Sequence, residues 1–304
     1  GCTNLKEFIV PESVETIKQY AFENCDSLSK IHISSKVYSV DSQAFLGCSS
    51  LSTITVDENN PSYDSRENCN AIIKTNKNML IAGCSNTVFP ESVTSINEYA
   101  FCDRKNITEI TIPDTISEIG SRAFMSCTNL KKITIPESVN TIKESAFSKC
   151  SSLTEIDIPK SISKLEAHTF SHCSSLSEIY IPETLTEISP YAFSGCDFKS
   201  VDVNENNPVY DCRENCNAII ETVSDTMIYG GKYSTFPESV TVIGDSAFVF
   251  STIKKLVIPE TITQVKTYAF AECTNLEEIT LPNTLNKISY GLFSGRTSLY
   301  KVNI

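Results

Sequence analysis

The amino-acid sequence predicts a β-rich solenoid with one curved parallel sheet of about eleven short strands. Turns, short 3-10 pieces or extended pieces are expected on the other side. Three observations predict this fold: a phenylalanine that returns at a fixed spacing, an Ile-x-Ile segment in each unit, and a proline after most of these segments. A fixed period is examined before local structure because it makes each unit one turn of a stack.

The phenylalanine, usually preceded by alanine, recurs mostly every 23 residues. One such unit cannot offset its own ordering entropy, roughly 1–2 kcal/mol per residue for the backbone, so several units must stack. Stacking places each ring on the ring of the preceding unit, and burial of each ring contributes about 1.5–3 kcal/mol. The predicted ring ladder comprises Phe22, Phe45, Phe101, Phe124, Phe147, Phe170, Phe193, Phe248, Phe270 and Phe293.

The Ile-x-Ile alternation is the period-2 signature of a short strand with one buried face. Proline follows it directly, as at Pro113, Pro136 and Pro159, and ends the strand because it cannot donate a ladder hydrogen bond. The Ser/Thr-rich stretch between the proline and the Ala-Phe pair suits a turn and a second short extended piece.

Two inserts, at about 57–90 and 204–237, lengthen the spacing to 56 and 55 residues. They resemble each other, and each contains two apolar runs separated by a polar break, which predicts a β-hairpin. We expect both hairpins to project from the solenoid. Because the repeat resumes after each insert, residues 1–304 are expected to form a single domain.

The unit Ile-Pro-x-Ser-Val-x-x-Ile-x-x-x-Ala-Phe-x-x-Cys-x-x-Leu-x-x-Ile resembles the BspA-like (Treponema-type) leucine-rich repeat of gut-bacterial surface proteins. The period of 23 falls within the range of leucine-rich repeats. This resemblance implies a secreted or surface-anchored protein that binds matrix proteins, host receptors or other cells, and it supplies no catalytic residues. We therefore expect an extracellular or cell-surface location. Both ends of the chain fall within a repeat and solenoids need polar caps, so we also expect the chain to be an excerpt of a longer secreted protein.

Eight of the thirteen cysteines occupy one slot of the repeat, which favours small buried side chains that remain thiols. Off-register cysteines are better disulfide candidates, and Cys69 could meet Cys84 across the first hairpin. The eight ladder cysteines are Cys2, Cys25, Cys48, Cys127, Cys150, Cys173, Cys196 and Cys273.

Enzymatic and cofactor chemistry has little support in the sequence. His168 and His172, with Cys173 alongside, invite a metal or Cys-His interpretation, but both histidines occupy variable positions that flank Phe170. We therefore expect no catalytic residues, no cofactor and no metal. The formal charge of -12 and the absence of a basic run argue against nucleic acid, and no apolar stretch is long enough for membrane insertion in this segment.

The best candidate for partner binding lies on the solvent face of the predicted sheet. Residues on either side of the first isoleucine point outward there, and carboxylates gather around one exposed tyrosine, a pattern that suits a cationic partner. This predicted protein-binding patch comprises Glu155, Asp157, Glu178, Tyr180 and Asp202.

The inserts are a second candidate, although their mutual similarity favours a shared structural module. The sequence thus predicts a non-catalytic adhesion or protein-recognition surface. The alternative is a glycan-binding or polysaccharide-capture protein, which would use exposed aromatic platforms. Tryptophan is absent, and Tyr180 stands alone on the sheet.

Overall fold

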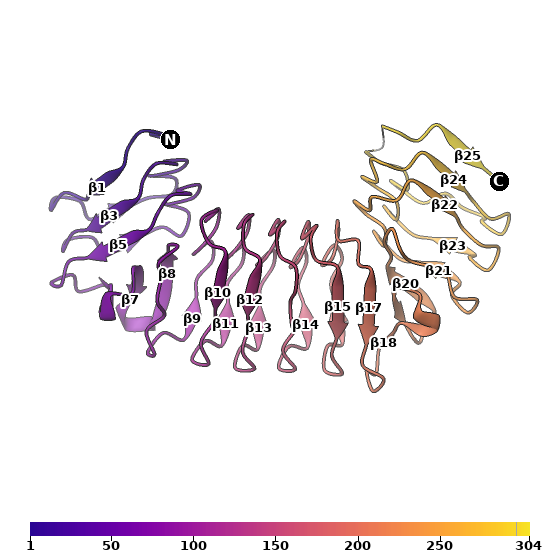
Figure 1. Cartoon of the computed structure of the whole chain (residues 1–304), viewed down its shortest axis with the longest axis horizontal. Helices are drawn as coiled ribbons and strands as arrows, with labels where there is room; N and C mark the ends of the chain where they lie inside the picture. The colour runs from indigo at the N-terminus through magenta and orange to yellow at the C-terminus, as the bar shows by residue number, and fades with distance from the viewer. Residues whose placement is uncertain (296) are drawn as a thin grey trace. The chain divides into compact units, whose positions relative to one another are not determined.

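The computed structural model describes residues 1–295 and 297–304 (Figure 1). The chain divides into two compact units, unit 1 (Gly1–Leu153) and unit 2 (Thr154–Ile304). Each unit is a stack of turns, and most turns have a strand on one side, a two-residue strand on a second side and the Ala-Phe turn on a third. The predicted fold class, a leucine-rich-repeat type solenoid, is confirmed, while the single domain stays a prediction.

The Ile-x-Ile segments form the main strands, which pair in parallel with the register of the repeat: Lys30 lies beside Thr53, and Ile31 beside Ile54. Their side chains alternate between solvent and the interior, so each strand has one buried face. In unit 1 the main strands are β1 (Glu7–Ile9), β3 (Lys30–Ile33), β5 (Thr53–Val56), β10 (Glu109–Thr111) and β12 (Lys132–Thr134). In unit 2 they are β15 (Glu178–Ile181), β17 (Ser200–Val203), β22 (Lys255–Val257), β24 (Glu278–Thr280) and β25 (Lys301–Asn303).

The second extended piece is present as predicted in most turns. These two-residue strands also pair in parallel, as Glu118 does with Ser95 on one side and Thr141 on the other. In unit 1 they are β2 (Thr16–Ile17), β4 (Ser39–Val40), β9 (Ser95–Ile96), β11 (Glu118–Ile119) and β13 (Thr141–Ile142). In unit 2 they are β14 (Lys164–Leu165), β16 (Glu187–Ile188), β21 (Val242–Ile243) and β23 (Gln264–Val265).

The Ala-Phe turn carries a third hydrogen-bond ladder that the sequence analysis did not predict. In most turns the residues two before and two after the phenylalanine have a left-handed backbone, as do Tyr99 (φ 57°) and Asp103 (φ 59°). Alternating left- and right-handed residues aligns successive N–H groups on one side of the chain. The Phe101 N–H therefore donates to the Ala123 carbonyl of the next turn at 2.7 Å, and the Asp103 N–H donates to Met125 at 2.8 Å.

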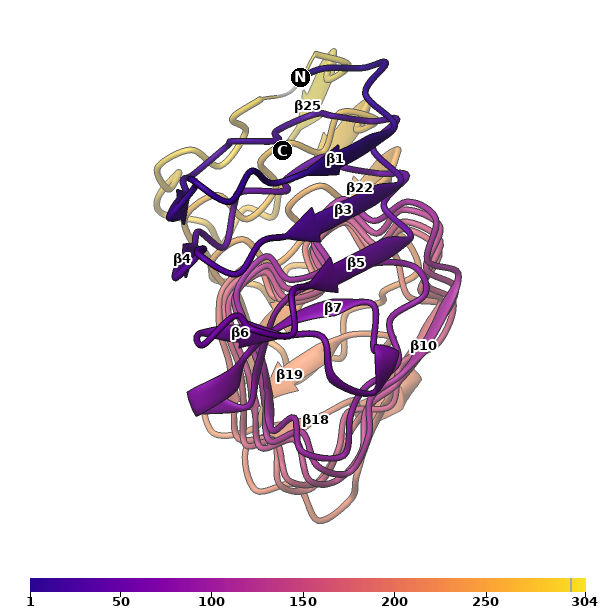
Figure 2. The ribbon, with the colours of Figure 1, turned by 90° about the vertical axis from the view of Figure 1, so that its left-hand side faces the viewer.

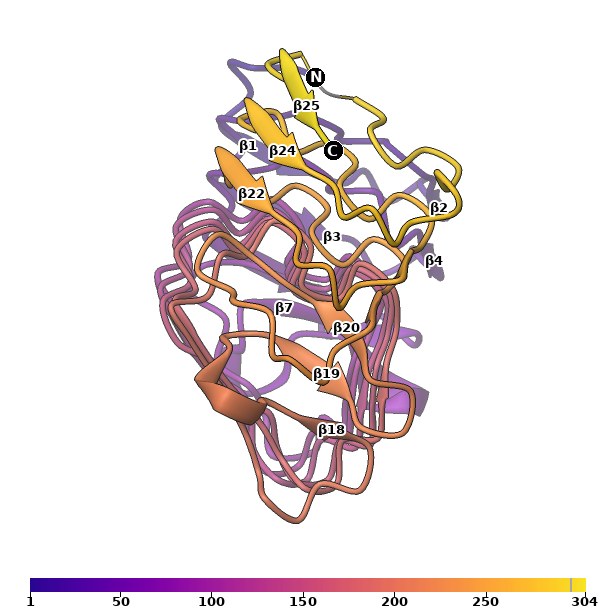
Figure 3. The same cartoon turned by 90° about the vertical axis from the view of Figure 1, so that its right-hand side faces the viewer.

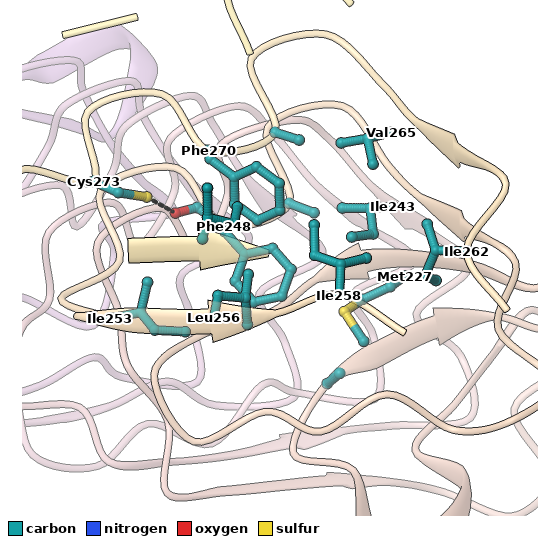
Figure 4. Close-up of a cluster of buried hydrophobic side chains, with 14 of the residues drawn as sticks. Met227, Ile243, Phe248, Ile253, Leu256, Ile258, Ile262, Val265, Phe270 and Cys273 are labelled. Carbon is teal, nitrogen blue, oxygen red and sulfur yellow. Dashed lines mark hydrogen bonds between the residues drawn. The ribbon is translucent and has the colours of Figure 1, made fainter. Parts of the chain in front are cut away.

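The repeat phenylalanines stack in the interior. The ring centroids of Phe101 and Phe124 lie 4.9 Å apart with 4° between their planes, and those of Phe170 and Phe193 lie 5.9 Å apart with 7° between their planes. Figure 4 shows Phe248 and Phe270 one above the other, surrounded by branched aliphatic side chains. Within each unit the aromatic rings therefore pack into the aliphatic core.

The hairpins do not project, and the expectation that they would is wrong. In unit 1 the antiparallel strands β7 (Ala71–Lys74) and β8 (Met79–Gly83) continue the second side of the solenoid, where β8 pairs in parallel with β9 (Figure 1). Strands β6 (Tyr63–Asp64) and β7 of the same insert are labelled in Figure 2. In unit 2, β20 (Thr226–Tyr229) pairs in parallel with β21. On its other side it pairs with β19 (Ile219–Glu221), as Figure 3 shows. The physical reason is burial, since both hairpin strands are apolar and Ile72, Ile73 and Leu80 are fully buried.

The main sheet is therefore interrupted at each insert. In unit 1, β5 does not pair with β10, and in unit 2, β17 does not pair with β22. The first insert contains β6 (Tyr63–Asp64), η1 (Arg66–Asn68), β7 (Ala71–Lys74), η2 (Thr75–Lys77) and β8 (Met79–Gly83). The second contains β18 (Tyr210–Asp211), η3 (Arg213–Asn215), β19 (Ile219–Glu221) and β20 (Thr226–Tyr229). Across the described residues, no helix has the length and apolar character needed to cross a bilayer.

Candidate functional site

The five predicted partner-binding residues are all solvent-exposed and all lie in unit 2. Tyr180 and Asp202 are direct neighbours on β15 and β17, and Glu178 lies beside Ser200. Glu155 and Asp157 hold the equivalent positions one turn earlier, on either side of the buried Ile156. We call this group the acidic strand patch: Glu155, Asp157, Glu178, Tyr180 and Asp202.

At the equivalent strand position of other turns, opposite charges lie side by side within each unit. The Lys30 ammonium lies 2.9 Å from the Glu7 carboxylate in unit 1, and Lys255 lies 3.0 Å from Glu278 in unit 2. In the acidic strand patch this alternation stops, because glutamates occupy the equivalent position in two successive turns, at 155 and 178. Like charges on adjacent strands repel, so a cationic group bound there would relieve an existing cost.

Three of the four patch carboxylates form no ion pair with the described part of the chain. Among residues 1–295 and 297–304, Asp157, Glu178 and Asp202 take part in no ion pair. The tyrosine is held in place, because the Asn204 side-chain amide donates to its hydroxyl oxygen at 2.8 Å. Tyr180 is 42% exposed, so an oriented ring lies beside Glu178 and Asp202, two carboxylates without an ion pair among the described residues.

The motif that the two inserts share makes hydrogen bonds within the chain, between each insert and the turn before it. The amide of the buried Asn60 donates to the carbonyls of Ser34 and Val37, both at 2.8 Å, and accepts from the Tyr63 N–H. Asn207 repeats this contact with Pro182 and Leu185, at 2.7 Å and 2.9 Å. One asparagine side chain thus joins each insert to the turn before it.

The tyrosine and the arginine of the motif complete this junction. The Val40 N–H donates to the Tyr63 hydroxyl at 2.9 Å, and the Arg66 guanidinium forms a bidentate pair with Asp64. Burial raises the pKa of Asp64, but hydrogen bonds from Arg66 and Thr75 outweigh that effect and hold it below its usual value. Tyr210, Asp211 and Arg213 repeat the arrangement in unit 2. These contacts favour the structural interpretation of the shared motif.

Sequence reasoning missed Arg104, which occupies the slot of the ladder cysteine immediately after the first insert. Its side chain is 1% exposed and donates to the carbonyls of Gly83 at 3.0 Å, Phe45 at 3.1 Å and Cys102 at 3.0 Å. It thereby joins the turn before the insert to the turn after it. The available signal was a charged residue at a position that is cysteine in most units.

At the second insert, Tyr229 replaces a backbone hydrogen bond that a shortened turn cannot form. In a full-length turn the N–H at the leucine position donates to the cysteine carbonyl, as Leu176 does to Cys173 at 3.0 Å. The turn that ends at Phe198 is one residue shorter, and the buried Tyr229 hydroxyl bridges the same two positions. It accepts from the Phe198 N–H at 3.2 Å and donates to the Cys196 carbonyl at 2.7 Å.

The ladder cysteines are thiols, and most of them donate to the preceding turn. The Cys48 thiol lies 3.1 Å from the Phe22 carbonyl, and the Cys127 thiol lies 3.1 Å from that of Phe101. Burial raises the pKa of Cys48 to about 11 and that of Cys196 to about 12. Protonated, buried sulfurs are poor nucleophiles and poor metal ligands.

His168 and His172 occupy the left-handed positions that flank Phe170, each with φ 59°. His168 stacks on Tyr191 at 5.0 Å, and His172 meets Phe250 edge-on at 4.5 Å, so both rings pack against aromatic neighbours. In the described part of the chain, no group of three or more His, Cys, Asp or Glu residues is placed to hold a metal ion.

Comparison with known proteins supports the architecture. The model of the BspA type leucine-rich repeat region, with six copies, matches residues 1–92, 73–199 and 228–304. Among solved structures, a leucine-rich repeat protein from Eubacterium ventriosum is 16% identical, with a TM-score of 0.50, over 98% of this chain and 71% of that one. One from Bacteroides ovatus is 24% identical, with a TM-score of 0.48, over 98% and 86%.

The pneumococcal vaccine antigen PcpA is 20% identical, with a TM-score of 0.49, over 99% of this chain and 69% of that one. No curated protein matches the chain. The family model covers both stacks of Ala-Phe turns and leaves out only residues 200–227. This chain therefore belongs to the BspA type leucine-rich repeat family.

Proposed function

We propose that this protein is a non-catalytic binding protein of the cell surface or extracellular space, and that the acidic strand patch recognises a cationic region of a partner protein. The observation that carries the proposal is a group of carboxylates around an exposed Tyr180, of which Asp157, Glu178 and Asp202 form no ion pair within residues 1–295 and 297–304. Tyrosine and charged pairs are typical anchors of protein interfaces.

The partner class follows from this chemistry. A lysine or arginine side chain offers both a charge that complements the carboxylates and a group that can lie over the tyrosine ring. A host matrix protein, a host receptor or a protein on another cell can present such a segment. Glycan capture has less support, because the Tyr180 hydroxyl is already bonded to Asn204 and no second ring accompanies it among the five patch residues.

The test compares two variants with equal net charge. The patch variant carries Glu155→Gln, Asp157→Asn, Glu178→Gln and Asp202→Asn, and the control carries Gln at the exposed Glu15, Glu91, Glu118 and Glu238. Both change the formal charge from -12 to -8, since four carboxylates are removed from the -12 of the chain.

Binding to immobilised extracellular-matrix proteins and to an arginine-rich peptide is measured by surface plasmon resonance at low and at physiological salt. We expect the patch variant to bind at least about tenfold more weakly, the control to bind like wild type, and added salt to weaken wild-type binding. Equal losses in both variants would show that only net charge matters, and unchanged binding of the patch variant would overturn the proposal.

A further inference from the structure

The interruption of the main sheet in unit 1 leaves one edge of β10 open. In an uninterrupted ladder the edge that faces the preceding turn is paired: the Thr53 N–H donates to Ser29, and the Asp57 N–H donates to Ile33. Glu109 and Thr111 occupy the positions of Thr53 and Thr55 in β10, so their N–H and C=O groups point toward the first insert. Within the described residues, neither backbone has a hydrogen-bond partner on that side.

A slot of about 370 Å³ adjoins this edge, between β10 and residues 84–89 of the insert. Its apolar lining includes Val88, Phe89 and Ile110. Ile110 is partly exposed, whereas its counterparts Ile54 and Ile133 are 1% and 4% exposed, because no strand covers it. Val88 is 64% exposed. The slot therefore combines open backbone groups with an uncovered apolar surface.

These features select one kind of occupant. Alternating N–H and C=O groups at strand spacing are complemented by an extended polypeptide backbone, which is the basis of β-strand addition. An apolar residue at the position paired with Ile110 would cover its exposed surface, and a basic residue would complement the charge of the exposed Glu109. Glu109 and Pro113 also flank the edge. Because a charge and a proline limit how far pairing can extend along a strand edge, they favour a short segment.

We propose that the edge of β10 binds a short extended peptide segment of a partner protein as an added strand. Its apolar residue lies on Ile110, and its basic residue lies beside Glu109. The segment takes the place of the strand that would pair with this edge if the first insert did not interrupt the sheet. This site belongs to unit 1 and does not rest on the acidic strand patch.

The chain itself provides the probe. A synthetic peptide with the sequence of residues 130–136, acetylated, amidated and fluorescently labelled, places Lys132 and Ile133 in the register that they already adopt against Glu109 and Ile110 on the other edge of β10. The control peptide replaces both isoleucines with serine and keeps both lysines. Binding is measured by fluorescence anisotropy.

Two variants test the site in the full chain. Thr111→Pro removes a backbone donor that faces the slot, and its matched control is Val257→Pro at the same position of β22 in unit 2. Val88→Lys places a charge in the slot, and its control is Val223→Lys in the second insert, where the side chain is 92% exposed. Because Val88 is largely exposed, Val88→Lys should leave the fold intact. It therefore still tests the site if Thr111→Pro prevents folding.

We expect saturable binding of the isoleucine peptide at one site, because β22, whose edge is likewise unpaired, carries Lys255 where β10 carries Glu109 and would repel the lysines of the peptide. Thr111→Pro and Val88→Lys should each weaken it at least about tenfold, while both controls and the patch variant bind like wild type. Failure of wild type to bind, equal binding of the serine peptide, or unchanged binding by Val88→Lys would overturn the proposal. Loss of binding in the patch variant alone would place the peptide on unit 2 and would also overturn it.

Discussion

The ladder cysteine serves both packing and hydrogen bonding in each turn. The Phe22 carbonyl accepts the Cys25 N–H of its own turn at 3.2 Å and the Cys48 thiol of the next turn at 3.1 Å. A thiol fits this position because it packs as a small apolar group and still supplies a weak donor. The same geometry recurs at Cys273, whose thiol donates to the Phe248 carbonyl at 2.9 Å (Figure 4).

The raised thiol pKa values predict a loss of stability in alkali. Burial raises the pKa of Cys48 to about 11 in the folded chain, above the ordinary value near 9.0. Between these values the unfolded thiol releases its proton while the folded thiol keeps it, so the free energy of unfolding falls as pH rises. We expect a loss of about 1 kcal/mol at pH 10 for such a thiol.

Urea unfolding followed by circular dichroism between pH 7 and pH 10.5 measures this slope. Cys48→Ala removes one titrating thiol and should make the decline shallower, which separates cysteine from tyrosine ionisation. An equal decline in wild type and in Cys48→Ala would show that the ladder thiol does not contribute.

At the scale of elements, each insert is a module that must rejoin the stack on both of its sides. Asn60 and Tyr63 join the first insert to the preceding turn, and Gly83 joins it to the following one. The Gly83 N–H donates to the Ala100 carbonyl at 2.8 Å, and a Cβ at this position would lie 2.1 Å from Cε1 of Phe101. Glycine is therefore required where the hairpin meets the next aromatic ring.

Removing the Tyr229 hydroxyl should destabilise the second junction. Tyr229→Phe leaves the Phe198 N–H and the Cys196 carbonyl, both in a buried environment, without the bridge that joins them. We expect a loss of about 1–3 kcal/mol in the free energy of unfolding, from urea titration at pH 7. Tyr233→Phe, at a 40% exposed position, should change it little. Equal stability of both variants would contradict the bridging role.

Features set by one repeat unit could be predicted from the sequence, whereas features set by several units could not. The strand alternation around Ile179 was enough to place Glu178 and Tyr180 on the solvent face. The bond from Asn204 to Tyr180 could not be foreseen, because Asn204 lies beyond the strand and in the next turn. The role of Arg104 could not be predicted either, because its contact with Phe45 spans 59 residues and depends on where the hairpin lies.

At the scale of the whole molecule, both units repeat one design in which successive turns are joined along three sides. The main strands, the two-residue strands and the Ala-Phe turns each supply backbone hydrogen bonds between neighbouring turns. This holds side chains of different turns in fixed columns, such as the acidic strand patch. A preorganised column favours recognition because little side-chain ordering is left for binding.

Native-state hydrogen exchange tests this three-sided stacking most directly. If the third ladder exists, the amides of Phe101, Phe124 and Ser126 should exchange as slowly as those of β12. The amides of Glu109 and Thr111, at the open edge, should exchange quickly. Exchange of the Ala-Phe turns at the rate of an unstructured loop, with protection confined to the main strands, would contradict the account.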